Sequence, residues 1–522
     1  MIRVTRRHFL GLLGGTAVGA AIGVPLLSGV RGASSTGMLL RSQLPLPQPF
    51  TRPLPIPPIL APTHTDNDTD YYDLVQRAAT SEILPGIQTT IWGYNGIFPG
   101  PTIVSRSGRR TVVRHRNELP VPVVVHLHGG RNPPEHDGYP TDLLLPVGTG
   151  AATTGHQHGG SAHNGNFTVG EREYNYPMVQ RAATLWYHDH RMDFTGASVW
   201  RGLAGFHLIH DAEETALPLP REGRDIPLMI TDRAFTADGA LAYPSLDPTL
   251  LGQPGVAEPY GAGVLGDVIL VNGAPWPIAD VPAARHRLRL LNASNARRYR
   301  LALDPPPPGG GGLVQIGADG GLLDHPISHD AIEIAPAQRF DVIVDFGRYP
   351  VGQEITLVNQ FGDGATALII RFRVTHTATD DTLIPARLSS SPAPEQALAD
   401  TSRTMRFRHG DIDGMAGWTI NDTPFAADRI NAQVRLGTTE VWRLLSDFHH
   451  PIHLHLARFR VLSRGIGGPG AYDHGWKDTL DLRPAEEATI LVDFDGYAGK
   501  YVFHCHNLEH EDMAMMGNFV AT

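Results

Sequence analysis

Four short motifs in this chain place histidines at spacings that suit metal binding. Each contains two histidines separated by one residue, and in one motif that residue is a cysteine. A single pair is weak evidence, because histidines often lie satisfied at protein surfaces. Four such pairs, each at or near the end of a predicted strand, indicate metal chemistry. The pairs are His126 and His128, His188 and His190, His453 and His455 (with His450 just before them), and His504 and His506.

The spacing of two has a direct structural meaning in the stretch His504-Cys505-His506. Alternate residues of a strand point to one face, and the residue between them points to the other. One strand can therefore hold two separate copper centres, with Cys505 at one and the two histidines at the other. A thiolate, two imidazoles and a weak axial thioether describe a blue-copper electron-transfer site. Cys505, His510 and Met515 would supply three of those ligands and a distant histidine the fourth, whereas zinc rarely uses such a set.

Cys505 is the only cysteine among 522 residues. It cannot form a disulfide within the chain, so it is either an inert buried residue or a functional ligand. The metal-binding side chains around it favour a ligand.

The elements that must position these motifs are predicted to be short strands. The chain has 57 Gly and 43 Pro, which suggests many turns and hence an all-β design. Runs such as TVVRHR and RHRLRLL alternate polar and apolar residues, as half-buried strands do. The DPPPPGGGG stretch at 304–312 is expected to be a hairpin loop between two strands.

A weak internal repeat predicts three similar β-sandwiches in series. The stretches NGIFPGPTI, VNGAPWPI and INDTPF each follow a predicted strand and open a new block. The expected organisation is a signal peptide at 1–35, a Pro-rich segment at 36–70, a first domain at 71–217, a second domain without copper ligands at 218–376, a linker at 377–400 and a third domain at 401–522.

The N-terminus is typical of a secretory signal. Arg3, Arg6 and Arg7 precede a Gly/Ala-rich apolar run, and the Thr5–Leu10 core resembles the twin-arginine type. This predicts export by the twin-arginine machinery to the periplasm or the exterior, with no stable membrane insertion after signal removal. An uncleaved membrane anchor is the alternative. The net charge of -10, without a basic stripe, argues against a nucleic-acid partner.

Taken together, the motifs resemble those of the multicopper oxidase family and occur in its chain order. The likeness runs from about Leu54 to the C-terminus, and it favours the bacterial laccase branch similar to spore-coat laccase, bilirubin oxidase and phenoxazinone synthase. It is carried by WGYNGIFPGPTI, VHLHGG, LWYHDH, LVNGAPWP, RLLNASNARRY, GADGGLL, HPIHLHL and HCHNLEHED. The resemblance implies three consecutive cupredoxin-like Greek-key β-sandwich domains and four copper ions.

The resemblance also assigns each ion its ligands, with His449 beside His450 read as a bystander. They are His450, Cys505, His510 and Met515 for the type 1 copper, His126 and His453 for the type 2 copper, and His128, His188, His190, His455, His504 and His506 for the type 3 pair.

A mechanism follows from this assignment. A small aromatic reductant would give single electrons to the type 1 copper through the exposed edge of His510. Cys505 would carry them to His504 and His506, where four electrons reduce O2 to two waters. Asp137 and Glu511 match acidic residues that this branch places near the type 2 copper and the dioxygen site, where they would relay protons.

The sequence leaves several alternatives open. The substrate is expected to be a phenol, aminophenol or aromatic amine; the alternative is a metallo-oxidase acting on Cu(I) or Mn(II). The chain has ten Met and no Met-rich insert, which favours the organic donor. A non-catalytic cupredoxin-fold protein would lack ligands that this chain has, and a nitrite reductase would lack the complete type 3 set. His156, His158 and His163 lie in a Gly-rich stretch that is expected to be a surface loop rather than a further copper site. His207 and His286 are expected to be structural or surface residues.

Overall fold

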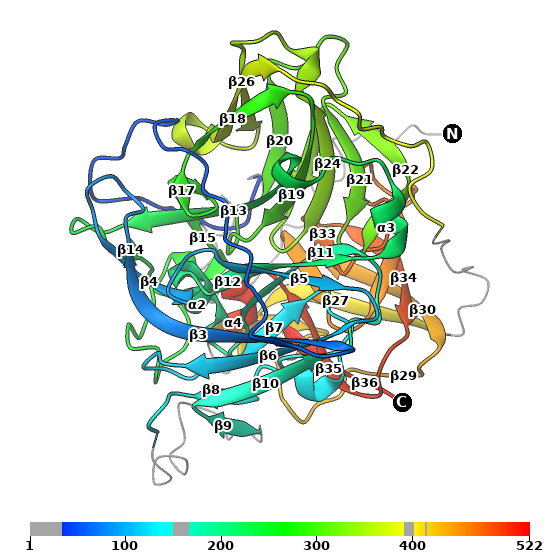
Figure 1. Cartoon of the computed structure of the whole chain (residues 1–522). Helices are drawn as coiled ribbons and strands as arrows, with labels where there is room; N and C mark the ends of the chain where they lie inside the picture. Colours follow the sequence, from blue (N-terminus) through cyan, green and yellow to red (C-terminus); the bar gives the residue numbers. More distant parts are fainter. Residues whose placement is uncertain (1–33, 150–165, 391–400, 413–414) are drawn as a thin grey trace, which may run out of the picture.

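The computed structural model describes residues 34–149, 166–390, 401–412 and 415–522 (Figure 1). The predicted signal peptide therefore lies outside the described residues except for Ser34 and Ser35. His156, His158 and His163 lie outside them as well, as does the 391–400 part of the predicted linker. Across the described residues, no helix has the length and apolar character that crossing a membrane would require.

The first part of the chain forms two sheets that enclose a core rich in tyrosine. Val125 and Leu127 of one sheet alternate with its histidines and pack into the same core as Tyr174 of the other. The first sheet has the order β10 (Glu171–Tyr176), β6 (Arg110–Asn117), β3 (Thr69–Ser81) and β2 (His64–Thr65), with β4 (Thr89–Tyr94) also on β3; the second has the order β5 (Gly100–Arg106), β12 (Ala204–His210), β11 (Ala183–Asp189) and β7 (Val125–His128).

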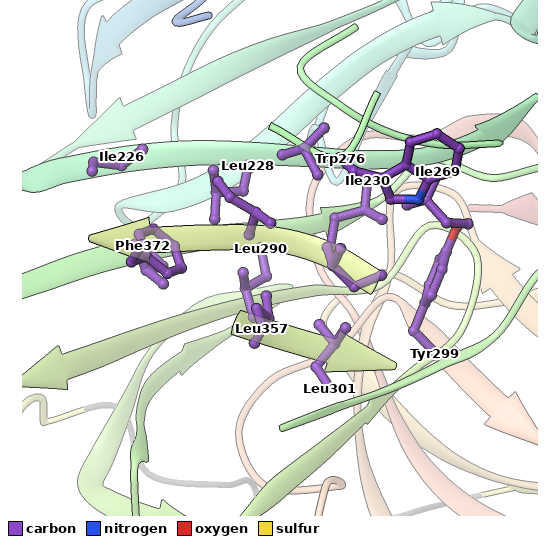
Figure 2. Packing of buried hydrophobic residues seen from close by; sticks show 14 of the residues in the cluster. Ile226, Leu228, Ile230, Ile269, Trp276, Leu290, Tyr299, Leu301, Leu357 and Phe372 are labelled. Carbon is purple, nitrogen blue, oxygen red and sulfur yellow. The ribbon is translucent and has the colours of Figure 1, made fainter. Parts of the chain in front are cut away.

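The middle part forms a second sandwich with the largest apolar core (Figure 2). Ile226, Leu228 and Ile230 alternate along β13 and meet Leu357 and Phe372 of the facing sheet. One sheet has the order β17 (Ala274–Pro275), β16 (Val268–Val271), β13 (Asp225–Phe235), β19 (Arg285–Asn292), β24 (Arg339–Asp345), β21 (Leu313–Ala318) and β22 (Gly321–His329), with β14 (Leu241–Ala242) on β13; the other has the order β18 (Ile278–Ala283), β26 (Leu368–Thr377), β25 (Glu354–Asn359), β20 (Tyr299–Asp304) and β23 (Ala331–Ile334).

The last part forms a third sandwich whose core includes Cys505 and Met515. One sheet has the order β28 (Met415–Ile420), β27 (Thr401–Ile412), β30 (Thr438–Ser446), β34 (Glu487–Phe494) and β32 (Arg458–Arg464); the other has the order β29 (Ala432–Val434), β36 (Met516–Ala521), β35 (Gly499–Cys505), β31 (His450–Leu454) and β33 (Thr479–Leu482).

The remaining elements are short. Two strand pairs lie outside the sandwiches, β1 (Met38–Leu40) with β15 (Val264–Gly266) and β8 (Leu143–Leu145) with β9 (Phe167–Val169). The helical turns are η2 (Pro134–His136), α2 (Thr195–Arg201), α3 (Ala212–Ala216), η4 (Glu222–Arg224), η5 (Tyr260–Ala262), η6 (Phe346–Arg348), η7 (Gly364–Ala367) and α4 (Leu508–Asp512).

The predicted fold class, an all-β chain of three consecutive β-sandwiches, is confirmed. The hairpin expected around the DPPPPGGGG stretch is wrong. Strand β20 pairs with β23 and β25, whereas β21 pairs with β22 and β24, so residues 304–312 cross from one sheet of the middle sandwich to the other.

Buried arginines join the first sandwich to the second. Arg287 lies between Glu214 and Asp341, and Arg289 donates to Thr184 Oγ1 at 3.1 Å. Removing one partner of a buried ion pair costs about 3–5 kcal/mol, because the other charge is left uncompensated. These pairs therefore fix how the first two sandwiches dock.

Candidate copper centres

The first two histidine pairs lie on neighbouring strands of the first sandwich. His126 and His128 are on β7, and His188 is on β11 with His190 directly after it. The strands pair antiparallel with His188 opposite His126, so the histidines share one region of the sheet. The spacing of two keeps each pair on one face, as the sequence predicts.

The third sandwich repeats this arrangement. His453 lies on β31 and His504 on β35, directly opposite each other in the register, and His455 and His506 follow at the ends of the strands. Cys505 lies opposite Ile452 and faces the apolar core.

The eight histidines of the two sandwiches meet in one buried cluster, here called the histidine cluster. The Nε2 atoms of His190, His455 and His504 lie 3.2 Å from one another. Elsewhere in the cluster, His453 Nε2 lies 3.4 Å from His126 Nε2. Its members are His126, His128, His188, His190, His453, His455, His504 and His506, all buried.

Most of these rings are held from outside through one nitrogen. The Nδ1 atoms of His126, His188 and His453 bond backbone carbonyls at 2.6, 2.8 and 2.9 Å. His128 differs, because its Nε2 bonds Asp478 Oδ1 at 3.1 Å. An N–H that donates outward fixes the ring tautomer and leaves the other nitrogen with a lone pair directed inward.

The inward-facing nitrogens fit a bound cation. His128 Nδ1, His188 Nε2 and both nitrogens of His506 have no hydrogen-bond partner. Burial lowers the pKa of His188 to about 3 and that of His190 to about 4, so these rings are neutral. Lone pairs of neutral imidazoles only 3.2 Å apart repel one another unless a metal ion accepts them, and imidazole suits copper.

Cys505 belongs to a second cluster with His450, His510 and Met515, here called the cysteine cluster. Cys505 Sγ lies 3.5 Å from His450 Nδ1 and from His510 Nδ1, and these nitrogens are 3.1 Å apart. Cys505 N donates to Met515 O at 3.1 Å, which keeps the methionine in the same core. This donor set fits a blue-copper site.

The two carboxylates that the sequence predicts as proton relays are buried and touch the histidine cluster. Asp137 Oδ2 accepts from His455 Nδ1 at 2.6 Å, and burial raises the pKa of Asp137 well above its usual value. Glu511 lies 3.1 Å from His504 Nδ1 and 3.5 Å from His190 Nδ1. Burial acts to raise the pKa of Glu511, but the two histidines outweigh it and lower this pKa below its usual value.

The expectation that His510 has an exposed edge is wrong. His510 is fully buried, its Nε2 donates to Ala262 O at 3.1 Å, and its ring stacks on Trp418 with centroids 3.6 Å apart. The cause is η5, which reaches from the middle sandwich over the ring. His449 lies outside both clusters, with its Nε2 3.2 Å from Arg298 Nη1. This position agrees with the prediction that His449 is not a copper ligand.

Three side chains that position ligand rings, directly or through another side chain, were not predicted from the sequence. Asp447 Oδ1 accepts from His450 Nε2, Asp478 accepts from His128, and Arg339 of the middle sandwich binds Asp478 through both guanidinium nitrogens. Asp447, three residues before His450, could have been considered from its position. The other two come together only in the docked domains.

A cleft lined by His126, His453 and His455 reaches the histidine cluster from the surface. Arg131 and Lys477 also line it. Small molecules such as O2 and water have a route of approach to the histidine cluster there.

Comparison with known proteins agrees with these sites. Two multicopper oxidase family models match, one at residues 76–155 and 162–214 and the other at residues 391–522. The laccase of Bacillus subtilis (strain 168) is 36% identical over 90% of this chain and 97% of its own, and the bilirubin oxidase of Albifimbria verrucaria is 35% identical over 91% and 81%. A crystal structure of a multi-copper oxidase from Pediococcus acidilactici has a TM-score of 0.78 and 30% identity, covering 93% of both chains.

The chain belongs to the multicopper oxidase family. It is laccase-like and a copper-dependent oxidoreductase that uses O2 as acceptor.

Proposed function

We propose that the two clusters hold four copper ions. The type 1 copper would take the cysteine cluster, His450, Cys505, His510 and Met515. The type 2 copper would take His126 and His453, and the type 3 pair His128, His188, His190, His455, His504 and His506. The unpartnered inward nitrogens support this assignment.

The proposed reaction is the one-electron oxidation of phenols, aminophenols or aromatic amines, coupled to the reduction of O2 to water. Bound copper would supply the one-electron chemistry and the affinity for O2. Four donor molecules, four protons and one O2 would give four oxidised donors and two waters. Electrons would reach the cysteine cluster and pass along the backbone from Cys505 to its neighbours His504 and His506.

Proton delivery would fall to Asp137 and Glu511. Asp137 Oδ1 has no hydrogen-bond partner and lies 3.8 Å from His126 Nδ1, so it can carry a proton beside the proposed type 2 site. Glu511 lies beside Nδ1 of His190 and Nδ1 of His504, whereas Asp137 contacts His455. The two carboxylates would serve different parts of the cluster.

One observation carries the proposal: Cys505 lies 3.5 Å from the nitrogens of two histidines while its neighbours His504 and His506 face a separate cluster. A buried structural cysteine needs no such surroundings. The test is oxygen uptake by the copper-loaded protein with 2,6-dimethoxyphenol, o-aminophenol, bilirubin and Cu(I), with Cys505→Ser as the blank. Uptake with organic donors that the variant lacks is expected. Uptake with Cu(I) alone would instead favour a metallo-oxidase, and the absence of uptake with all four donors would contradict the proposal.

We also propose that the protein is exported through the twin-arginine pathway, on the evidence of Arg6 and Arg7. Cell fractionation of a strain that produces the Arg6→Lys, Arg7→Lys variant should show the enzyme retained in the cytoplasm. Normal export of this variant would contradict the twin-arginine route.

A further inference from the structure

The two histidines of the cysteine cluster are held by different kinds of acceptor. His450 Nε2 donates to Asp447 Oδ1 at 2.8 Å, whereas His510 Nε2 donates to the backbone carbonyl of Ala262 at 3.1 Å. One ring therefore contacts a carboxylate and the other a neutral group, although both present Nδ1 to Cys505.

Asp447 is fixed in this position. Its Oδ1 also accepts from Phe448 N at 2.8 Å, and its Oδ2 accepts from His409 N at 2.7 Å. These donors are backbone amides, which orient the carboxylate without cancelling its charge. The Asp447 side chain is 25% exposed.

When a carboxylate accepts a hydrogen bond from one nitrogen of a ligating imidazole, the other nitrogen of that ring becomes a stronger electron-pair donor to the metal. Stronger donation and the nearby negative charge both stabilise Cu(II) more than Cu(I), because the oxidised ion carries more charge. We propose that Asp447 is a positioning residue that acts through His450 to lower the reduction potential of the type 1 copper. This inference rests on the proposed type 1 centre and extends it to substrate choice: the enzyme would favour easily oxidised, electron-rich aromatic donors.

The experiment is a redox titration of the copper-loaded full chain, followed through its blue absorption, for the wild type and Asp447→Asn. The asparagine keeps the shape and an acceptor oxygen but removes the charge. The type 1 Cu(I)/Cu(II) equilibrium should shift about tenfold toward Cu(I), which is 59 mV for a one-electron couple. Turnover of donors that are difficult to oxidise should rise in the same variant.

Glu487→Gln is the matched control. Glu487 lies on β34 of the other sheet and bonds Arg443 at 2.8 Å, so its loss removes a charge of the same sign from the same sandwich without touching the cluster. Its potential should equal that of the wild type.

The outcomes separate the inference from the proposed function. If the wild type shows no blue absorption, the proposed type 1 centre fails. If Asp447→Asn, or the smaller Asp447→Ser, is blue and keeps the wild-type potential, the role of Asp447 is refuted. Loss of the blue band with copper still bound would also refute it, because the carboxylate would then hold the ligand rather than tune it.

Discussion

The cysteine cluster and the histidine cluster are built in different ways. Cys505, His510 and Met515 come from one short stretch, and His450 comes from the neighbouring strand, so a single sandwich contains the whole set. The histidine cluster takes four rings from the first sandwich and four from the third. The first site depends on local folding, and the second depends on domain docking.

The difference extends to how the rings are held and reached. The histidine cluster has carboxylates at Asp137, Glu511 and Asp478 and a cleft to the surface. The cysteine cluster is closed over by Ala262 and Trp418. A site whose ligand rings are buried suits electron transfer, whereas O2 reduction needs access for small molecules and protons. If this comparison is correct, substitutions should damage one cluster and spare the other.

The largest effect is expected from Cys505→Ser. The serine hydroxyl is a poor copper ligand compared with a thiolate, so the blue absorption should vanish and donor oxidation should fall to background. Copper content should fall by one ion per chain, because the histidine cluster does not use the thiol. Copper analysis and EPR check this, and loss of all copper would show that the two clusters are not independent.

Asp137→Asn should slow O2 reduction while sparing the cysteine cluster. Loss of a group that orients a ligand and supplies protons typically lowers activity about 10–100-fold. Anaerobic stopped-flow reduction of the blue band by the donor should be unchanged, whereas reoxidation by O2 should slow. Equal slowing of both half-reactions would contradict the separation of roles.

A smaller effect is expected from Asp478→Asn, which weakens the bond between Arg339 and the carboxylate that holds His128. Copper affinity of the histidine cluster should fall about 10-fold. The blue absorption serves as an internal control, because Asp478 does not contact the cysteine cluster. Copper titration monitored by EPR checks this, and a matching loss of the blue band would indicate general unfolding instead.

Alternation along strands made much of this site predictable from the sequence. His504 and Cys505 had to face opposite sides of one strand, and the structure places them in separate clusters. The same rule put His126 and His128 on one face. The period of two is a local property of the strand backbone, so it does not depend on contacts with the rest of the chain.

Contacts between domains could not be predicted in this way. The burial of His510 depends on Ala262, 248 residues away, and the ring of His128 depends on Asp478, 350 residues away. No local pattern marks such partners. The hairpin prediction for residues 304–312 was wrong for a related reason. The turn residues there predict a reversal of the chain, but the strands that pair with β20 and β21 lie elsewhere in the sequence and place these two strands in different sheets.

The last prediction concerns a buried histidine outside both clusters, His115. Its ring is buried like those of the proposed ligands, but it packs only in the core of the first sandwich. Its Nδ1 lies 2.8 Å from Gln76 Nε2, and burial lowers its pKa to about 3. Below an unfolded pKa of about 6.5, the unfolded chain binds a proton that the folded protein does not, so stability falls as the pH drops. Between pH 8 and 5, this histidine should cost about 2 kcal/mol of unfolding free energy.

Urea unfolding of the copper-free wild type and of the His115→Gln variant, at pH 8 and pH 5, measures how much unfolding free energy His115 costs between these pH values. The variant should lose about 2 kcal/mol less than the wild type, since the ligand histidines titrate equally in both proteins and cancel. Because His115 contacts neither cluster, the oxidase activity of the copper-loaded variant at neutral pH should be unchanged. Equal losses in the two proteins would mean that His115 is protonated in the fold, and the distinction between structural and ligand histidines would then need another basis.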